Sequence, residues 1–141
     1  MSQDGTEQIG ISTDWHMQIG EVAERTELSI KTIRHYDDVG LVTPSERSAG
    51  GFRLYTEADV QRLLVIRRMK PLGFTLDEMR QLLESLEILE SGALGGSKTV
   101  AQAFLTEFHI RAEESCLKLR KQIAYAEELT ALLAQCATAA E

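Results

Sequence analysis

The chain has 141 residues, a net charge of −7 and an apolar fraction of 43%, which suit one small globular domain or one domain with an extension. No apolar run approaches the ~20 residues of a membrane span, and the first 16 residues lack the basic start and apolar stretch of a secretory signal. Two cysteines twenty residues apart, with no CxxC motif, exclude a disulfide-rich scaffold and favour a reducing, cytoplasmic compartment.

The charges are unevenly distributed along the chain. Residues 1–16 carry three acids and no Lys or Arg, and residues 87–141 carry eight acids against five bases. Residues 29–70 instead carry eight bases against five acids. The acidic total by itself argues against a nucleic-acid partner, but the local basic excess favours one at 29–70. We expect 1–16 to be a flexible extension.

Residues 18–40 predict two short helices joined by a tight turn, which is a helix-turn-helix pattern. The first helix is expected at about 18–25. Ser29 is expected to cap the second helix, because its hydroxyl can accept a hydrogen bond from a free amide of the first turn. Gly40 is expected to end that helix in a left-handed conformation. The side chains predicted to face inward from the second helix are Ile30, Ile33 and Val39.

Residues 41–55 predict a β-hairpin beside these helices. Pro44 and the pair Gly50–Gly51 interrupt helix, whereas 41–42 and 52–55 suit short strands. A hairpin with a glycine tip next to a helix-turn-helix is a wing. Its glycines would let the backbone approach a phosphate chain closely.

Two further helices are predicted from their capping residues. Thr56 precedes a helix that continues to about Lys70 and has Asp59 three residues after the cap. Thr75 and Glu78 form a capping box at the start of a helix over 76–89. A joint over 91–97 follows, so the winged helix-turn-helix domain is expected to occupy 17–90.

Residues 98–135 predict one long helix of roughly 57 Å. Apolar side chains recur on one face with a spacing of seven residues, and a lone helix of this length cannot bury them. The simplest partner is the same helix of a second subunit, and the alternative is a helix folded back on its own domain. Residues 136–141 form a tail. The predicted seam consists of Leu105, Ala112, Cys116, Leu119, Ile123, Ala126 and Leu133.

Cationic and aromatic side chains of the helix-turn-helix and wing suit contacts with double-stranded DNA. Lys31, Arg34 and Tyr36 are spaced to reach backbone and base edges from one side of the second helix. Arg47 and Arg53 could neutralise phosphates or enter the minor groove, and the Tyr55 hydroxyl could donate to a phosphate. A plain glycine hairpin with solvated arginines is the alternative for the wing alone. The combination with the charge distribution favours DNA binding.

The chain over about 17–86 resembles the N-terminal domain of the MerR family of bacterial transcription regulators. The resemblance is carried by IGEVA, S-x-x-T-I-R-x-Y-D-x-x-G-L, R-x-x-x-G-F-R-x-Y and LGF-T-L-x-E-x-R. It implies a mainly α fold, in which a winged helix-turn-helix is followed by a long antiparallel coiled-coil dimerisation helix. Met17 falls where such regulators commonly begin.

The resemblance implies a homodimer on a pseudo-palindromic operator between two promoter hexamers. Bending and untwisting of that DNA would align the hexamers for RNA polymerase. Phe52 stands in place of the more frequent tyrosine, and Glu27 where glycine is usual. The positions that match the family's DNA contacts are Lys31, Arg34, Tyr36, Arg47, Phe52, Arg53 and Tyr55.

No metal or other cofactor is expected. The long helix starts without a cysteine, and Cys136 alone cannot hold a soft metal ion. Cys116 is interpreted as a seam residue, with a His109–Cys116 pair meeting its symmetry mate as the alternative. A small effector could still bind between 76–89, the joint and the long helix, where Trp15, Phe104 and Phe108 are the candidate aromatic residues.

Other functions stay open beside a promoter activator. One is an effector-independent repressor or architectural DNA-binding protein. Another is a helical adaptor whose winged domain binds protein. An enzyme is not expected, because no Gly-rich phosphate loop follows a strand and no Ser/His/Asp set is evident. Asp37 and Asp38 are interpreted as the solvated end of a helix.

Overall fold

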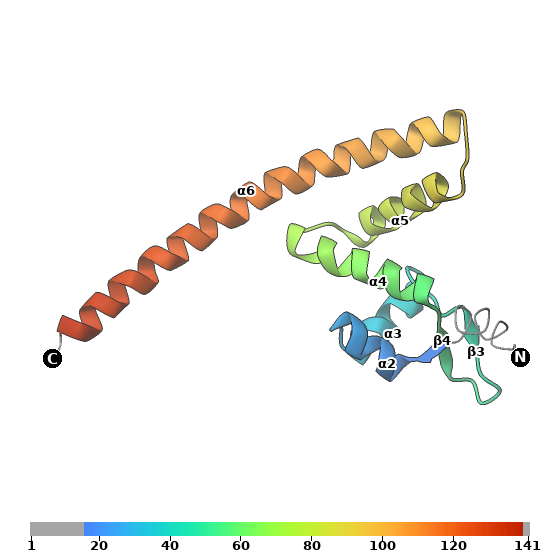
Figure 1. Ribbon diagram of the computed structural model, residues 1–141, viewed down its shortest axis with the longest axis horizontal. Helices are drawn as coiled ribbons and strands as arrows, with labels where there is room; N and C mark the ends of the chain where they lie inside the picture. Colours follow the sequence, from blue (N-terminus) through green and yellow to red (C-terminus); the bar gives the residue numbers. More distant parts are fainter. Residues whose placement is uncertain (1–15, 140–141) are drawn as a thin grey trace, which may run out of the picture. The chain divides into compact units, whose positions relative to one another are not determined.

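The computed structural model describes residues 16–139 and divides into two compact units after Leu83 (Figure 1). The mainly helical winged fold with a long C-terminal helix is confirmed. The predicted extension lies outside the described residues except for His16, and so do the last two residues of the predicted tail. In chain order the elements are β2 Met17–Gln18, α2 Ile19–Thr26, α3 Ile30–Asp38, β3 Glu46–Arg47, β4 Arg53–Tyr55, α4 Glu57–Met69, the 3-10 turn η1 Lys70–Leu72, α5 Leu76–Glu90 and α6 Gly96–Ala139.

The helix-turn-helix forms as predicted at both ends of α3. Ser29 accepts a hydrogen bond from the Thr32 amide at 3.0 Å, and Gly40 adopts φ +73° just after the helix. The predicted inward face is correct except at its first residue. Ile33 is fully buried and Val39 is half-buried, but Ile30 is 38% exposed, so its inward prediction was wrong. Ile30 is the first residue of α3, and the core contact is made one turn later.

The sheet has three short antiparallel strands in the order β2-β4-β3. Met17 pairs with Tyr55, and Arg47 pairs with Arg53 across the hairpin. The prediction of a strand at 41–42 was wrong. The amides of Leu41 and Val42 instead donate to the Tyr36 carbonyl at 2.9 and 3.3 Å, and both side chains are buried. Strand β2 was not predicted, because two residues are too few to show an alternating pattern.

The predicted caps at Thr56 and Thr75 are confirmed, and both form capping boxes. In α4, the Asp59 amide donates to Thr56 Oγ1 at 3.3 Å, and the Thr56 amide donates to Asp59 Oδ2 at 2.9 Å. In α5, the Glu78 amide donates to Thr75 Oγ1 at 3.1 Å, and the Thr75 amide donates to Glu78 Oε1 at 2.9 Å. These reciprocal bonds satisfy amides that helix geometry leaves free, and they fix where each helix begins.

Two arginines tie helix C-termini to distant parts of the winged unit. Arg67 Nη1 of α4 donates to the Thr26 carbonyl at the end of α2 at 2.8 Å. Arg80 of α5 donates to the Val39 and Gly40 carbonyls at 3.2 and 3.0 Å. A cation at these carbonyls complements the helix dipole. The second pair of bonds fixes the end of α3 to the first half of α5.

The core of the winged unit is formed mainly by α2, α3, α4 and β4, from which the β3–β4 hairpin projects (Figure 1). Each fully buried aliphatic side chain contributes about 1.5–3 kcal/mol to folding through its removal from water. The side chains at the centre of this core are Val22, Ile33, Tyr36, Tyr55, Val60, Leu63 and Ile66.

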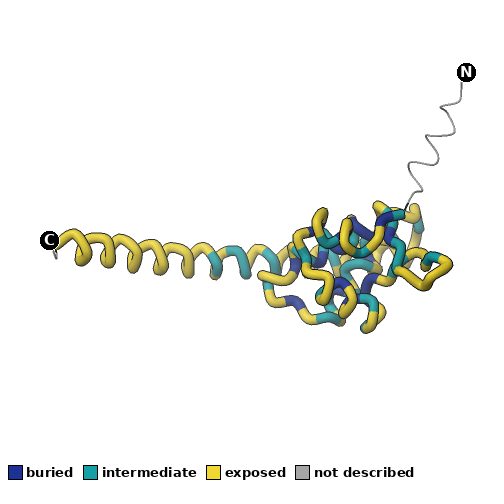
Figure 2. Tube along the Cα trace, turned by 90° about the horizontal axis from the view of Figure 1, so that it is seen from below, coloured by how far each residue is buried: buried dark blue, intermediate teal, exposed yellow. Residues whose placement is uncertain are grey.

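Helix α6 has 44 residues, longer than the predicted 98–135, and spans about 66 Å. Its side chains are exposed throughout 121–139 (Figure 2). Of the predicted seam, Leu105, Ala112, Cys116 and Leu119 are half-buried, whereas Ile123, Ala126 and Leu133 are exposed. Within 16–139 no helix is both long and apolar enough to span a membrane.

Candidate nucleic-acid interface

The exposed face of α3 carries Lys31 and Arg34, nearly one turn apart. This face lies opposite the buried Ile33 and Tyr36. Among residues 16–139, neither cation is held by an ion pair. Both are therefore available for an external anion.

Tyr36 lies on the other side of α3 from these cations. At about 100° per residue, position 36 is rotated about 140° from position 31, towards the core. Its exposed fraction is 3%, and its ring is tilted against His35 with 5.9 Å between ring centroids. The expectation that Tyr36 shares the open face of Lys31 and Arg34 was wrong, and its DNA contact is not supported by this placement.

The tip of the wing is a tight turn centred on Ser48 to Phe52. The Ser48 amide donates to the Phe52 carbonyl at 2.9 Å, and the Phe52 amide donates back to Ser48 Oγ at 3.1 Å. Gly51 closes the turn with φ +86°, a conformation that side chains rarely adopt. Phe52 is held by both backbone bonds, yet 64% of its surface is exposed. The predicted glycine tip with an accessible aromatic neighbour is therefore present.

The two wing arginines meet at one carboxylate of α3. Arg47 Nη2 lies 3.1 Å from Asp37 Oδ2, and Arg53 Nε lies 2.7 Å from the same oxygen. The Asp37 side chain is only 10% exposed, whereas that of Asp38 is 71% exposed and 4.0 Å from Arg53 Nη2. The interpretation of both acids as a solvated helix end holds for Asp38 and was wrong for Asp37.

These contacts shift the proton equilibria of the hairpin. The hydrogen bond to Asp37 raises the pKa of Arg53 above its usual value, so this guanidinium stays charged. Burial, reinforced by the charge of Asp37, raises the pKa of Tyr55 from 10 to about 12. The Tyr55 hydroxyl is buried without a hydrogen-bond partner in 16–139. The expectation that it reaches a phosphate is therefore contradicted by its position in the core.

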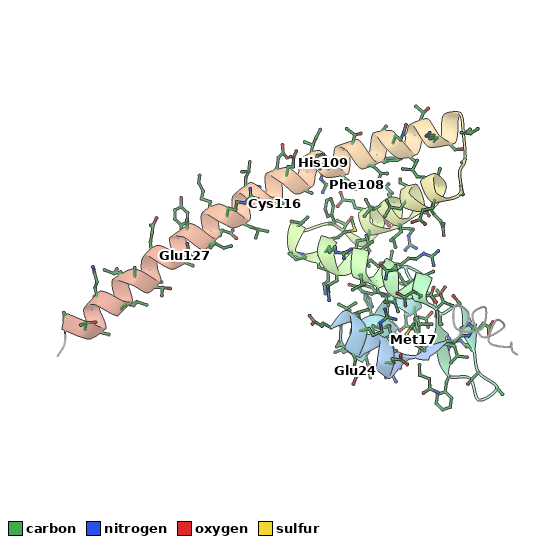
Figure 3. All side chains as sticks on the ribbon, in the orientation of Figure 1. Met17, Glu24, Phe108, His109, Cys116 and Glu127 are labelled. Atoms are coloured by element: carbon green, nitrogen blue, oxygen red, sulfur yellow. The ribbon has the colours of Figure 1, made fainter. Side chains whose placement is uncertain are left out.

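The candidates in α6 are spread along one helix (Figure 3). Cys116 is half-buried and Cys136 exposed, and His109 Nε2 lies 3.8 Å from Glu113 Oε2. Phe104 and Phe108 stack with ring centroids 6.5 Å apart. No group of three potential metal-ligating side chains occurs within 16–139. The effector site stays a prediction, and its candidate Trp15 lies outside the described residues.

Asp37 is the participant that sequence reasoning missed. A signal for it exists in the hairpin register: residues at the positions of Arg47 and Arg53 face one another, and like charges directly opposite in a sheet repel. An acid nearby in space would relieve this repulsion. Adjacent acids at the end of the preceding helix were the available candidates.

Comparison with known proteins places the chain among regulators of transcription. The family model for MerR helix-turn-helix regulatory proteins matches residues 17–86. The transcriptional regulator HmrR of Rhizobium leguminosarum bv. viciae is 42% identical over 98 residues, which cover 70% of this chain and 74% of HmrR. The regulator ZntR of Escherichia coli K12 is 40% identical over 97 residues, which cover 69% of each protein.

The fold also matches a solved structure. The crystal structure of HiNmlR, a MerR family regulator that lacks the sensor domain and is bound to promoter DNA, has a TM-score of 0.62. The comparison covers 84% of this chain and 88% of that chain, with 24% identity. At this identity the likeness concerns the fold.

Proposed function

Since this chain belongs to the MerR family of helix-turn-helix regulatory proteins and is a DNA-binding transcriptional regulator, we propose that it acts as a homodimer on a pseudo-palindromic promoter operator. In this proposal α3 lies in the major groove and the wing lies along the adjacent backbone. The contacts are assigned to Lys31, Arg34, Arg47, Phe52 and Arg53.

One observation carries the assignment: Asp37 joins the wing to the recognition helix. Both wing arginines are bound to the last turn of α3, the helix whose open face carries Lys31 and Arg34. Cations from separate segments therefore belong to one compact unit. Such a surface can neutralise several phosphates of one duplex while α3 contacts base edges.

Dimerisation is proposed through α6. This helix leaves Ile123 and Leu133 more than half exposed, with Ala126 between them. An apolar stripe with a spacing of seven residues is stabilised by packing against a second helix. A second copy provides a matching stripe and also brings a second DNA-binding unit, which a palindromic site requires.

We propose that the bound dimer bends and untwists the DNA between the two promoter hexamers, so that RNA polymerase can engage both. Such readout depends on DNA deformability as well as on contacts. We also propose that the protein acts in the cytoplasm. Transcription from the selected promoter, with and without candidate effectors, distinguishes an activator from an effector-independent repressor or architectural protein.

The test begins with selection of fragments from genomic DNA by the full-length protein. Fluorescence anisotropy then gives the affinity for a selected fragment at several salt concentrations. Arg34→Ala is expected to weaken binding by about 1–3 kcal/mol. Lys121→Ala removes one exposed charge from α6 and is expected to leave the affinity nearly unchanged.

Failure to enrich any fragment would contradict the proposal. A weak dependence of affinity on salt would favour the adaptor hypothesis, because DNA binding releases counterions and falls steeply with salt. Equal affinities of wild type and Arg34→Ala would remove α3 from the interface.

A further inference from the structure

We propose that Asp37 is a positioning residue for sequence discrimination: it holds both wing arginines in a fixed relation to the recognition helix. Removing its charge should weaken operator binding and strengthen binding to unrelated DNA. This inference rests on the proposed function and concerns the same surface.

The hairpin needs a counter-charge at this place. Arg47 and Arg53 are paired residues in neighbouring antiparallel strands, where like charges destabilise the pairing. Asp37 Oδ2 accepts hydrogen bonds from both, at 3.1 and 2.7 Å. The carboxylate thus removes a repulsion and fixes two long, otherwise mobile side chains.

The contact leaves each guanidinium able to bind DNA. Arg53 uses Nε for Asp37, so its Nη hydrogens remain, and Nη2 is 4.0 Å from Asp38, beyond hydrogen-bond distance. Arg47 uses Nη2 for Asp37 and Nη1 for the Gly51 carbonyl at 3.4 Å. The two side chains remain 50% and 24% exposed for Arg47 and Arg53. Asp37 therefore orients the cations without enclosing them.

Asp37 orients the two wing arginines relative to α3, because it belongs to that helix. Asp37 lies three residues after Arg34 in the same helix, and the end of that helix is fixed by the bonds from Arg80. The carboxylate is shielded from solvent, so ions screen its contacts less than those of an exposed pair. Base contacts by α3 and phosphate contacts by the wing can then be made together only in one register.

Two consequences of losing this charge act in opposite directions. The net positive charge of the surface rises, which strengthens attraction to any duplex. The arginines lose their fixed positions, which weakens the contacts that a particular operator requires. A purely structural role would lower affinity for both kinds of DNA together.

The experiment compares Asp37→Asn with Asp38→Asn. The second variant removes the same charge from the neighbouring residue, whose side chain is exposed. Anisotropy measures binding of the full-length protein to a selected operator fragment and to a scrambled duplex at several salt concentrations. For Asp37→Asn we expect operator affinity to fall about 10-fold and scrambled-duplex affinity to rise about 2-fold. For Asp38→Asn we expect both affinities to rise slightly and their ratio to stay within about 2-fold of wild type. Asp37→Glu, which restores the charge, should recover most of the ratio.

An unchanged ratio for Asp37→Asn, or an equal loss on both duplexes, would overturn the inference. If Asp37→Asn shows no cooperative melting, Asp37→Ser provides a smaller neutral side chain and is judged by the same outcomes. Failure of the wild type to prefer any fragment is distinct, since it would contradict the proposed function itself.

Discussion

The two units of this chain differ in how far their apolar side chains are buried. In the winged unit, Val22, Ile33 and Val60 have no exposed surface at all. In α6, Ile123 and Leu133 are 56% and 57% exposed. The winged unit completes its own core, whereas the helix presents an apolar stripe for which its own unit supplies no cover over 121–139.

The difference follows from how each unit satisfies its backbone and its core. The winged unit brings several short helices together and joins their ends by side chains such as Asp59, Arg67 and Arg80. A single helix satisfies its backbone internally, but over 121–139 α6 has no second surface of its own unit to pack against. The stability of α6 should therefore depend on association, and that of the winged unit should not.

The largest effect is expected from a charge in the α6 seam. Ile123→Glu would place a carboxylate against the partner helix twice per dimer, because each copy carries it. We expect the dimer to dissociate at least about 100-fold more readily. Sedimentation equilibrium measures this, and circular dichroism should show that the winged unit remains folded.

Leu117→Glu is the matched control for the seam. Leu117 is 62% exposed, but it lies about 120° around the helix from Ile123. We expect this variant to dimerise like the wild type. Equal weakening by both variants would mean that the seam is assigned to the wrong face of α6. A monomeric wild type at micromolar concentration would contradict the proposal that a second copy covers the apolar stripe.

Local features of the fold could be predicted from sequence because they depend on neighbouring residues. The capping residues Ser29, Thr56 and Thr75 act within one helical turn, and Gly40 ends α3 through its own backbone. Strand β2 could not be predicted, since its two residues form a strand only through pairing with β4. Ile30 was misplaced because periodicity gives the face of a helix and not how far the core extends along it.

The candidate interface could also be predicted only in part, because burial of its residues depends on packing between elements. Lys31 and Arg34 are exposed, as expected from their charge. Phe52 is exposed against the preference of its type, at a position where the family resemblance implied a DNA contact. Tyr36 and Tyr55 share sequence motifs with these residues, but packing from other elements buries both. The junction at Asp37 depends on contacts across ten and sixteen residues. The facing arginines of the hairpin favour an acid nearby, but they do not indicate which acid supplies it.

Within the winged unit, Tyr55→Phe is expected to have the next largest effect. The Tyr55 hydroxyl is buried without a partner in 16–139, so its removal should stabilise the protein by about 1 kcal/mol without changing dimerisation. Because the native pKa of Tyr55 is raised, to about 12 against 10, the wild type should lose stability as the pH rises through this interval.

Tyr55→Phe should lack that component of the alkaline loss. Urea unfolding at a series of pH values measures the difference between the two proteins. Operator affinity at neutral pH should be unchanged. A marked loss of affinity would restore Tyr55 to the interface and contradict its assignment to the core.

A smaller gain is expected at the turn between α2 and α3. Glu27 has φ +60°, a left-handed conformation that is costly for a residue with a Cβ atom. Glu27→Gly should raise stability by about 0.5–1 kcal/mol after allowing for the greater freedom of glycine in the unfolded chain. The Arg67 Nη1–Glu27 Oε1 contact that it removes is long, at 3.7 Å, and the carboxylate is 83% exposed. Thermal melting measures the effect, and Glu24→Gly, within α2, is the control, for which we expect a loss of stability. A loss of stability for Glu27→Gly as well would contradict the proposed backbone strain at Glu27.

The smallest effect concerns the ion pair between α2 and α4. Arg25 donates to both carboxylate oxygens of Glu57, at 2.6 and 3.0 Å, and this bond, with a second from Gln61, lowers the pKa of Glu57. Because the native pKa is lowered, the pair stabilises the fold above the ordinary value of 4.5, and the contribution disappears as the pH falls through the native pKa. Half of the Glu57 side chain is exposed, so salt should reduce the effect further. In urea unfolding, the free energy of unfolding of Glu57→Gln should therefore be slightly below that of the wild type at neutral pH and equal to it in strong acid. A deficit that persists unchanged in acid would mean that Glu57 contributes by packing and not by charge.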